Sequence, residues 1–159
     1  MGLFHDPEAA ARAHQIGEGA RLRLSLGGRS PGQVPVEAEF EVIALSDGKC
    51  RFTGEMYGGG VATLGPTAAL RLVGQAAQID LVVTSIRNQC LDQALFTHLK
   101  LEPRSYRVVC VKSTVHFRAD FDPIASETHA VAAPGLFLCD LEQVSYKTLC
   151  GKRITTLLQ

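Results

Sequence analysis

Two apolar runs in this chain each end abruptly at polar residues, a pattern that predicts two buried strands leading into polar corners. The first run consists of Ile79 and residues 81–83 and is ended by residues 84–85. The second consists of residues 108–111 and is ended by residues 112–114. Short, continuous apolar runs bounded by polar residues are typical of strands buried inside a sheet. If both strands lie parallel, their carboxyl ends open at the same edge of the sheet.

Helices are predicted at three places. The chain from about residue 91 to 99 has a helical pattern after the first corner, and a second helix is expected to begin near Thr114 and to stop before Pro123. Near the start of the chain, Asp6 is expected to cap a helix that ends at Gly17. An Asp cap followed by Pro at the first helical position and Gly at the end is a typical pair of helix boundaries.

Further strands are predicted from alternation of apolar and polar residues. Residues 22–26 and 34–42 alternate strictly, which places Glu37, Glu39 and Glu41 on the face opposite the apolar residues. Like charges two residues apart favour a solvent-exposed strand face over paired catalytic carboxylates. The alternation changes phase after Val42, which indicates a bulge or bend. Two more strands are expected from Ala68 and from His129. The sequence thus predicts an α+β fold with a mixed sheet, an antiparallel N-terminal meander and a C-terminal β-α-β-α-β portion.

Composition narrows the class of protein. The chain has 159 residues, 46% hydrophobic and 20% charged, which is enough for one sizeable core, and we expect a single domain over residues 1–159. Sixteen basic and sixteen acidic residues cancel, so neither a nucleic acid nor a membrane is an expected partner. Five scattered cysteines and the lack of a recognisable signal peptide favour reduced thiols in the cytoplasm.

The two polar corners together predict a site for a small anion or a peptide carboxylate. Hydroxyl, amide and cationic side chains follow both strands, and a helix N-terminus there would add free N–H groups. Each residue also has a structural interpretation, as a helix cap, a turn residue or a surface charge, and both interpretations stay open. The expected substrate-binding or anion-binding residues are Thr84, Ser85, Arg87, Gln89, Lys112, Ser113, His116 and Arg118.

Catalytic and metal-binding motifs are not found in the sequence. The five histidines form no His-Glu-x-x-His motif, and the five cysteines form no Cys-x-x-Cys motif. There is no Gly-x-Ser-x-Gly elbow. Residues 58–60 are three glycines, but the Lys and Ser or Thr of a phosphate-binding loop do not follow them. We therefore expect no catalytic residue and no metal ligand in this chain.

Several segments resemble the C-terminal domain of the MlrC-type (microcystinase C) metallopeptidases. The likeness is carried by residues 82–92, with the sequence Val-Val-Thr-Ser-Ile-Arg-Asn-Gln-Cys-Leu-Asp, and above all by residues 111–119, Val-Lys-Ser-Thr-Val-His-Phe-Arg-Ala. Residues 6–10 and 64–68 fit the same domain in the same order. The closing segment, residues 151–159, departs from the Arg-Pro and Pro-Leu-Asp pattern of that family.

The resemblance implies the C-terminal, substrate-side or structural domain of a zinc metallopeptidase. In that family the larger N-terminal domain supplies the zinc ligands, so no cofactor is expected in this chain and the isolated chain is expected to be inactive. The expected partner is that N-terminal domain, in cis or in trans, with a peptide or small anion as ligand. The alternative is a stand-alone, non-catalytic module that binds a small anion or a protein. Whether the chain is an excised domain or a complete short protein stays open at this point.

Overall fold

The computed structural model of the protein describes residues 2–29 and 32–133. The chain divides into two compact units, one made of Met1–Leu26 with Val36–Thr128 and the other of Gly27–Pro35 with His129–Gln159. All helices and strands of the described residues lie in the first unit. The closing segment 151–159 lies outside the described residues. That residues 1–159 form a single domain stays a prediction.

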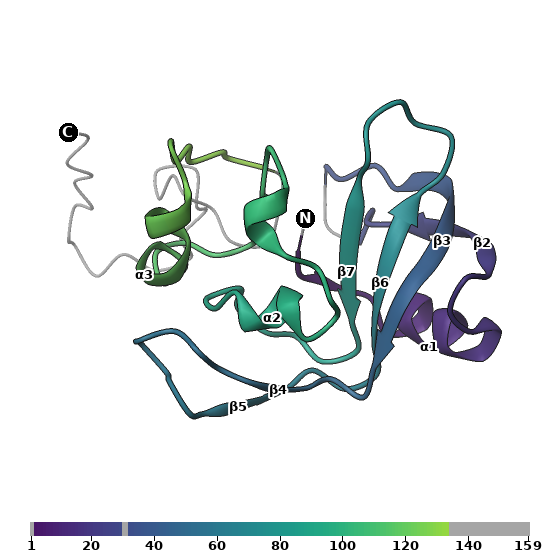
Figure 1. The fold of residues 1–159 in the computed structure, drawn as a ribbon. Helices are drawn as coiled ribbons and strands as arrows, with labels where there is room; N and C mark the ends of the chain where they lie inside the picture. The colour runs from purple at the N-terminus through teal and green to yellow at the C-terminus, as the bar shows by residue number, and fades with distance from the viewer. Residues whose placement is uncertain (1, 30–31, 134–159) are drawn as a thin grey trace, which may run out of the picture. The chain divides into compact units, whose positions relative to one another are not determined.

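A five-stranded mixed sheet is the centre of the first unit (Figure 1). Its strands, in spatial order, are β1 (Phe4–His5), β7 (Asp80–Thr84), β6 (Thr67–Leu72), β3 (Val36–Ser46) and β2 (Arg21–Leu26). The pair β1 and β7 is parallel, and the other three pairs are antiparallel. A separate two-stranded sheet is formed by β4 (Lys49–Arg51) and β5 (Val61–Thr63). The predicted α+β class, with a mixed sheet and an antiparallel meander, is confirmed.

Side-chain alternation sets the register of the antiparallel strands. Leu22, Leu24 and Leu26 are buried on one face of β2, and the intervening residues are exposed. In β3 the register shifts between Val42 and Ala44, which confirms the predicted irregularity. The shift reverses which face of the sheet each side chain after Val42 points to. Phe40 and Val42 therefore pack in the hydrophobic layer on one face of the sheet, and Ala44 packs in the layer on the other face.

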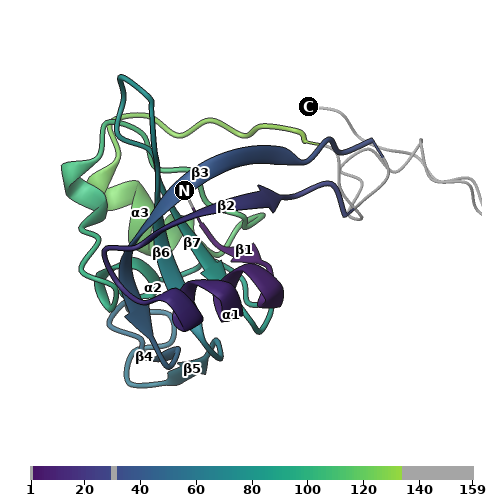
Figure 2. The ribbon, with the colours of Figure 1, turned by 90° about the vertical axis from the view of Figure 1, so that its right-hand side faces the viewer.

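Helix α1 (Pro7–Ile16) packs on one face of the sheet (Figure 2). The Asp6 side chain accepts a hydrogen bond from Ala9 N at 3.1 Å, and Pro7 is the first helical residue, as the sequence predicts. The last turn closes at Gly17, whose φ of +87° favours glycine. Three alanines, Ala9, Ala10 and Ala13, are buried against the sheet, which brings the helix close to the strands.

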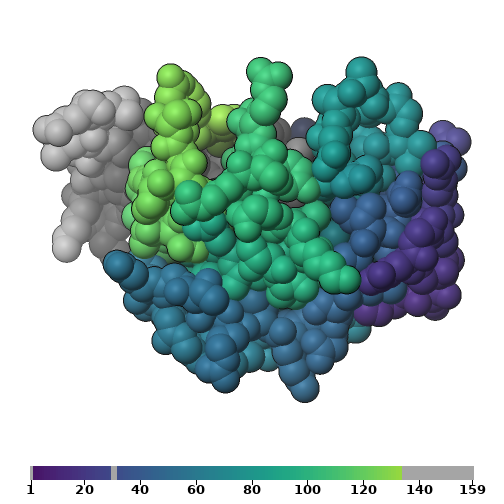
Figure 3. Space-filling view, viewed as in Figure 1, coloured from purple at the N-terminus to yellow at the C-terminus, as the bar shows by residue number. Residues whose placement is uncertain are grey.

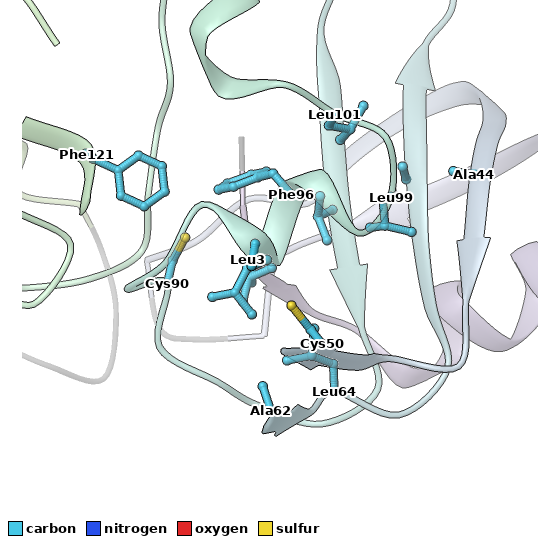
Figure 4. Packing of buried hydrophobic residues seen from close by; sticks show 14 residues of the cluster. Leu3, Ala44, Cys50, Ala62, Leu64, Cys90, Phe96, Leu99, Leu101 and Phe121 are labelled. Carbon is cyan, nitrogen blue, oxygen red and sulfur yellow. The ribbon is translucent and has the colours of Figure 1, made fainter. Parts of the chain in front are cut away.

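The second face of the sheet carries a different layer. It contains α2 (Ala94–Thr97) and the short helices η1 (Pro103–Ser105), α3 (Arg118–Phe121) and η2 (Asp122–Ile124). Leu95 and Leu99 are fully enclosed there, and the rings of Phe96 and Phe121 meet edge to face with centroids 6.0 Å apart (Figure 4). In the space-filling view this green layer lies in front of the sheet, above the blue β4–β5 hairpin (Figure 3). Burial on both faces of the sheet supplies the main stabilisation of the fold.

Three details of the C-terminal half differ from the sequence prediction. The run 108–111 is not a buried strand, since Val108 is 75% exposed and only Val111 forms a bridge, with Gly2. The helices are shorter than predicted, because α2 covers only Ala94–Thr97 and α3 begins at Arg118, not near residue 114. Residues 129–133 form no strand. The reason for the first difference is that the N-terminal segment occupies the position beside β7 and leaves the second run one short contact with the sheet.

Candidate functional site

The two predicted corners lie at the same edge of the sheet, but β1 lies between them. Because β1 is parallel to β7 and Gly2 pairs in parallel with Val111, three chain segments end at this edge in the same direction. Gly2 N donates to Cys110 O at 2.9 Å, and Lys112 N donates to Gly2 O at 3.0 Å. Tertiary pairing with the start of the chain, rather than direct pairing of the two apolar runs, therefore brings the corners to one edge.

Four of the predicted residues, Gln89, Lys112, Ser113 and His116, gather there, and we call them the polar edge. Gln89 Nε2 donates to Ser113 Oγ at 2.9 Å. The other atom of the same amide, Oε1, lies 3.0 Å from His116 Nδ1. Main-chain contact supports the arrangement, since Cys90 N lies 3.5 Å from Lys112 O. The loop after β7 thus holds the loop after Val111 through both ends of one glutamine amide.

The hydrogen bonds of Gln89 set the orientation of the histidine. An amide oxygen can only accept, so His116 Nδ1 carries the proton in this arrangement. His116 is exposed, and its Nε2 is left to bind a ligand as a donor when the ring is charged or as an acceptor when it is neutral. The Ser113 hydroxyl meets the Gln89 amide and not a ring nitrogen of His116, so no base is placed to take its proton, and the three residues do not form a nucleophile-activating triad. The arrangement is suited to binding.

The cations near this edge differ in how strongly they are held. The Lys112 ammonium lies 5.7 Å from the centre of the Phe4 ring and does not pair with Asp92 or Asp120. Arg118 pairs with Asp122 at 3.2 Å, so its charge is already partnered. Arg87 is exposed and makes no hydrogen bond or ion pair with the described residues. Lys112 and Arg87 therefore have their charges available to a ligand.

The side-chain hydroxyls of the remaining two predicted residues donate hydrogen bonds to backbone carbonyl oxygens. Thr84 is fully buried, and its hydroxyl donates to Ile86 O at 3.0 Å. The Ser85 hydroxyl donates to Pro66 O at 2.6 Å. In this geometry both residues close the turn after β7, which is the structural interpretation that the sequence left open. The helix N-terminus expected at Ser113 or Thr114 is also absent, since α3 has Phe117 as its N-cap with no capping side chain.

Sequence reasoning missed a buried carboxylate, Asp92. It is 1% exposed and accepts hydrogen bonds from Thr53 N at 3.0 Å, Gly54 N at 2.8 Å and Ala94 N at 2.8 Å. This one side chain connects the end of the β4 strand to the start of α2. An Asp two residues before a helix is a possible cap signal, but the sequence does not show that Thr53 and Gly54 lie beside it.

A second buried carboxylate, Asp80, lies in β7 and was also missed. Arg71 binds it through two atoms, Nε at 2.8 Å and NH2 at 3.0 Å, while Gln78 Nε2 donates at 2.8 Å and the Tyr106 hydroxyl at 2.5 Å. Burial alone would raise the pKa of Asp80, but these hydrogen bonds outweigh it and hold the pKa below its usual value. Burial and the bond to Asp80 raise the pKa of Tyr106 to about 12. The interaction fastens the segment around η1 to the sheet.

We expect Tyr106→Phe to lower the free energy of unfolding by about 1.5 kcal/mol at pH 7, because it removes a hydrogen bond to a buried carboxylate. Asp80 has a lowered folded pKa, so its stabilisation is present above its unfolded pKa and is lost as pH falls through the folded value. Tyr106 has a raised pKa, so its contribution is present below its unfolded pKa and is lost as pH rises toward about 12. Urea unfolding across pH should therefore show the largest gap between variant and wild type near neutrality. Tyr57→Phe, at an exposed hydroxyl, is the control, and an equal loss there would contradict the prediction.

The described residues contain no cluster of metal ligands, and two of their three cysteines are buried thiols. Within residues 2–29 and 32–133, no group of three or more His, Cys, Asp or Glu side chains is placed to hold a metal ion. Burial, with the nearby charge of Asp92, raises the pKa of Cys50 to about 11, and burial raises that of Cys90 to about 12. Both thiols stay protonated at neutral pH, where a thiol is a weak nucleophile. In the part of the chain that the structure describes, no helix is long and apolar enough to cross a membrane.

The chain is similar to known proteins in both sequence and fold. The sequence matches the family described as MlrC C-terminus over residues 1–148. It is 26% identical over 135 residues to Microcystinase C of Sphingomonas sp, a match that covers 84% of this chain and 25% of that protein. The fold is similar to the crystal structure of a "putative metallopeptidase" from Mesorhizobium sp. BNC1, with a TM-score of 0.66 and 25% sequence identity, over 76% of this chain and 24% of that one.

The extent of these matches defines what is shared. The chain spans about a quarter of the length of both relatives. The family match over residues 1–148 includes both polar corners. The resemblance carried by residues 82–92 and 111–119 is thereby confirmed. This chain belongs to the MlrC C-terminal domain family.

Proposed function

We propose that this chain is the substrate-side or structural domain of an MlrC-like zinc metallopeptidase and has no complete catalytic metal site of its own. The observation that carries the proposal is the match over residues 1–148 to a domain that makes up about a quarter of its longer relatives. The described residues provide no ligand set that fits a zinc ion, so we assign zinc to the preceding domain of such proteins. That domain is the proposed partner, in cis or in trans.

Within this role, we assign the polar edge to holding a carboxylate of a peptide substrate. The Lys112 ammonium offers a cationic donor at this edge, and the Ser113 hydroxyl and the exposed His116 ring are held by Gln89 on the same loop as Lys112. Arg87 adds an exposed cation on the loop after β7. A charge-assisted hydrogen bond from such a cation is worth roughly 1.5–3 kcal/mol where the contact is sheltered from water. Thr84, Ser85 and Arg118 keep a positioning role, since their polar groups bind the protein itself.

The test compares the isolated chain with a chimera in which the chain replaces the matching C-terminal quarter of the Sphingomonas Microcystinase C. We expect no peptide cleavage by the isolated chain and metal-dependent cleavage by the chimera. In the chimera, Lys112→Ala should raise KM at least tenfold with little change in kcat, because the lysine binds the substrate and takes no part in the reaction. Lys49→Ala, at the exposed first residue of β4, is the matched control and should change neither constant.

Three outcomes would contradict the proposal. Tightly bound zinc with chelator-sensitive cleavage by the isolated chain would show a complete active site in this domain. A folded chimera without activity would contradict the domain role and favour a stand-alone binding module. Equal KM values for the Lys112→Ala and Lys49→Ala chimeras would remove the polar edge from substrate binding while leaving the domain role intact.

A further inference from the structure

Strand β2 is the outermost strand of the five-stranded sheet on the side opposite β1 (Figure 2). It pairs with β3 along its full length, from Arg21 opposite Glu41 to Leu26 opposite Val36. The other edge of β2 pairs with no strand among the described residues. Such an edge presents backbone groups that can accept one more strand.

The hydrogen bonds around β2 identify which residues present these groups. Val42 N donates to Ala20 O, so the backbone C=O of Ala20 points toward β3. By alternation, the backbone N–H and C=O groups of Leu22, Leu24 and Leu26 also point toward β3. Arg21, Arg23 and Ser25 therefore direct their N–H and C=O groups away from the sheet. The contact of Arg12 confirms this direction, because its NH2 donates to Arg23 O at 2.9 Å from outside the ladder.

Three arginines lie at this edge, and none of them is held in a close ion pair with the described residues. Arg12 and Arg23 are exposed and form no ion pair with the described residues. Arg21 has only a loose contact with Glu41, at 4.0 Å with both side chains partly exposed. The side chains of Arg21 and Arg23 leave β2 on the face opposite α1, where an incoming strand would place every second side chain, whereas Arg12 reaches the same edge from α1.

Strand β3, the neighbour of β2 within the sheet, shows which side chains pair well with those of β2. Opposite Arg21 and Arg23, β3 presents Glu41 and Glu39 on one face. Opposite Leu22 and Leu24 it presents Phe40 and Ala38 on the other face. A second strand on the free edge meets the same alternating side chains, and cross-strand pairs of opposite charge are favourable.

We propose that the free edge of β2 binds an extended segment of another polypeptide in which acidic residues alternate with apolar ones. The backbone of this segment adds to the sheet at Arg21, Arg23 and Ser25, and its carboxylates pair with Arg21 and Arg23. Arg12 gives up its bond to Arg23 O when the strand arrives. A second copy of β2 is a poorer occupant, because antiparallel pairing of β2 with itself sets arginines opposite arginines or leaves them unpaired. The surface is separate from the polar edge and does not depend on the proposed peptidase role.

The test uses a synthetic acetylated peptide, Thr-Glu-Val-Glu-Val-Glu-Thr, and a matched peptide with Lys in place of each Glu. Titration followed by NMR on the full chain should show saturable binding of the acidic peptide, with slowed amide exchange at Arg21, Arg23 and Ser25. The Lys peptide should bind at least tenfold more weakly. Arg23→Pro should abolish binding and leave the fold intact, because Pro is tolerated on an edge strand where the N–H faces outward.

A charge-reversal variant of β2 provides a second, independent test. The double variant Arg21→Glu and Arg23→Glu should bind the Lys peptide at least tenfold better than the acidic one. The proposal is overturned by the absence of saturable binding of the acidic peptide, by equal binding of both peptides, or by a folded Arg23→Pro variant that binds normally. Sedimentation showing a dimer that Arg23→Pro dissociates would also overturn it, in favour of a second copy of this chain.

Discussion

Gly48→Ala is expected to lower the free energy of unfolding by about 3–5 kcal/mol, because the glycine lies at a left-handed backbone position against another segment. Its φ is +78°, and an added Cβ would lie 1.9 Å from Gly65 O. Gly48 O also accepts a hydrogen bond from Leu64 N at 2.9 Å, so the two segments cannot separate without loss of that bond. Chemical denaturation followed by circular dichroism would measure the change.

Gly74→Ala is the matched control for this prediction. Gly74 has nearly the same backbone angle, φ of +80°, but an added Cβ would meet no atom within 4 Å. We expect a loss of about 1–2 kcal/mol there, from the left-handed conformation alone. Equal losses at both positions would show that the contact with Gly65 yields without cost and would contradict the prediction.

Asp92→Ala is expected to lower the free energy of unfolding by about 3–5 kcal/mol. The substitution leaves the N–H groups of Thr53, Gly54 and Ala94 without their acceptor, and each unsatisfied buried donor costs about 1–3 kcal/mol. Asp92→Asn keeps one acceptor oxygen and should lose less. The same denaturation measurement applies.

Glu37→Ala is the control for a lost carboxylate at an exposed strand position. We expect it to change stability by no more than about 0.5 kcal/mol. If Asp92→Ala were equally mild, Thr53, Gly54 and Ala94 would have to find other partners or water, and the connection between β4 and α2 would not depend on this carboxylate. Together, Gly48 and Asp92 hold the β4–β5 hairpin to the rest of the unit at its two ends.

In the proposed function, this domain contributes substrate binding and positioning, and the zinc belongs to the neighbouring domain. The polar edge has these properties, since its donors are held by hydrogen bonds between two loops and no nucleophile in it is activated. Activity of the chimera, and the response of its KM to Lys112→Ala, would measure that contribution.

The sequence by itself determined the elements whose signals are local. The cap at Asp6, the glycine that ends α1, the alternating leucines of β2 and the irregularity after Val42 all depend on residues close together in the chain. Such features follow from backbone preferences and from burial of one face, which act over a few residues. The family resemblance belongs here too, because it rests on residue identities and order.

Only the tertiary structure decided the place of the second apolar run and the composition of the polar edge. Residues 108–111 have the pattern of a buried strand. The position beside β7 is taken by β1, however, and the run 108–111 forms only a single bridge, to Gly2. The hydroxyls of Thr84 and Ser85 bind backbone carbonyls, whereas the Gln89 side chain binds both Ser113 and His116. A pattern of apolar and polar residues shows that a segment is suited to burial, but contacts between distant segments compete for each place in the sheet, and their outcome depends on the packing of the whole unit.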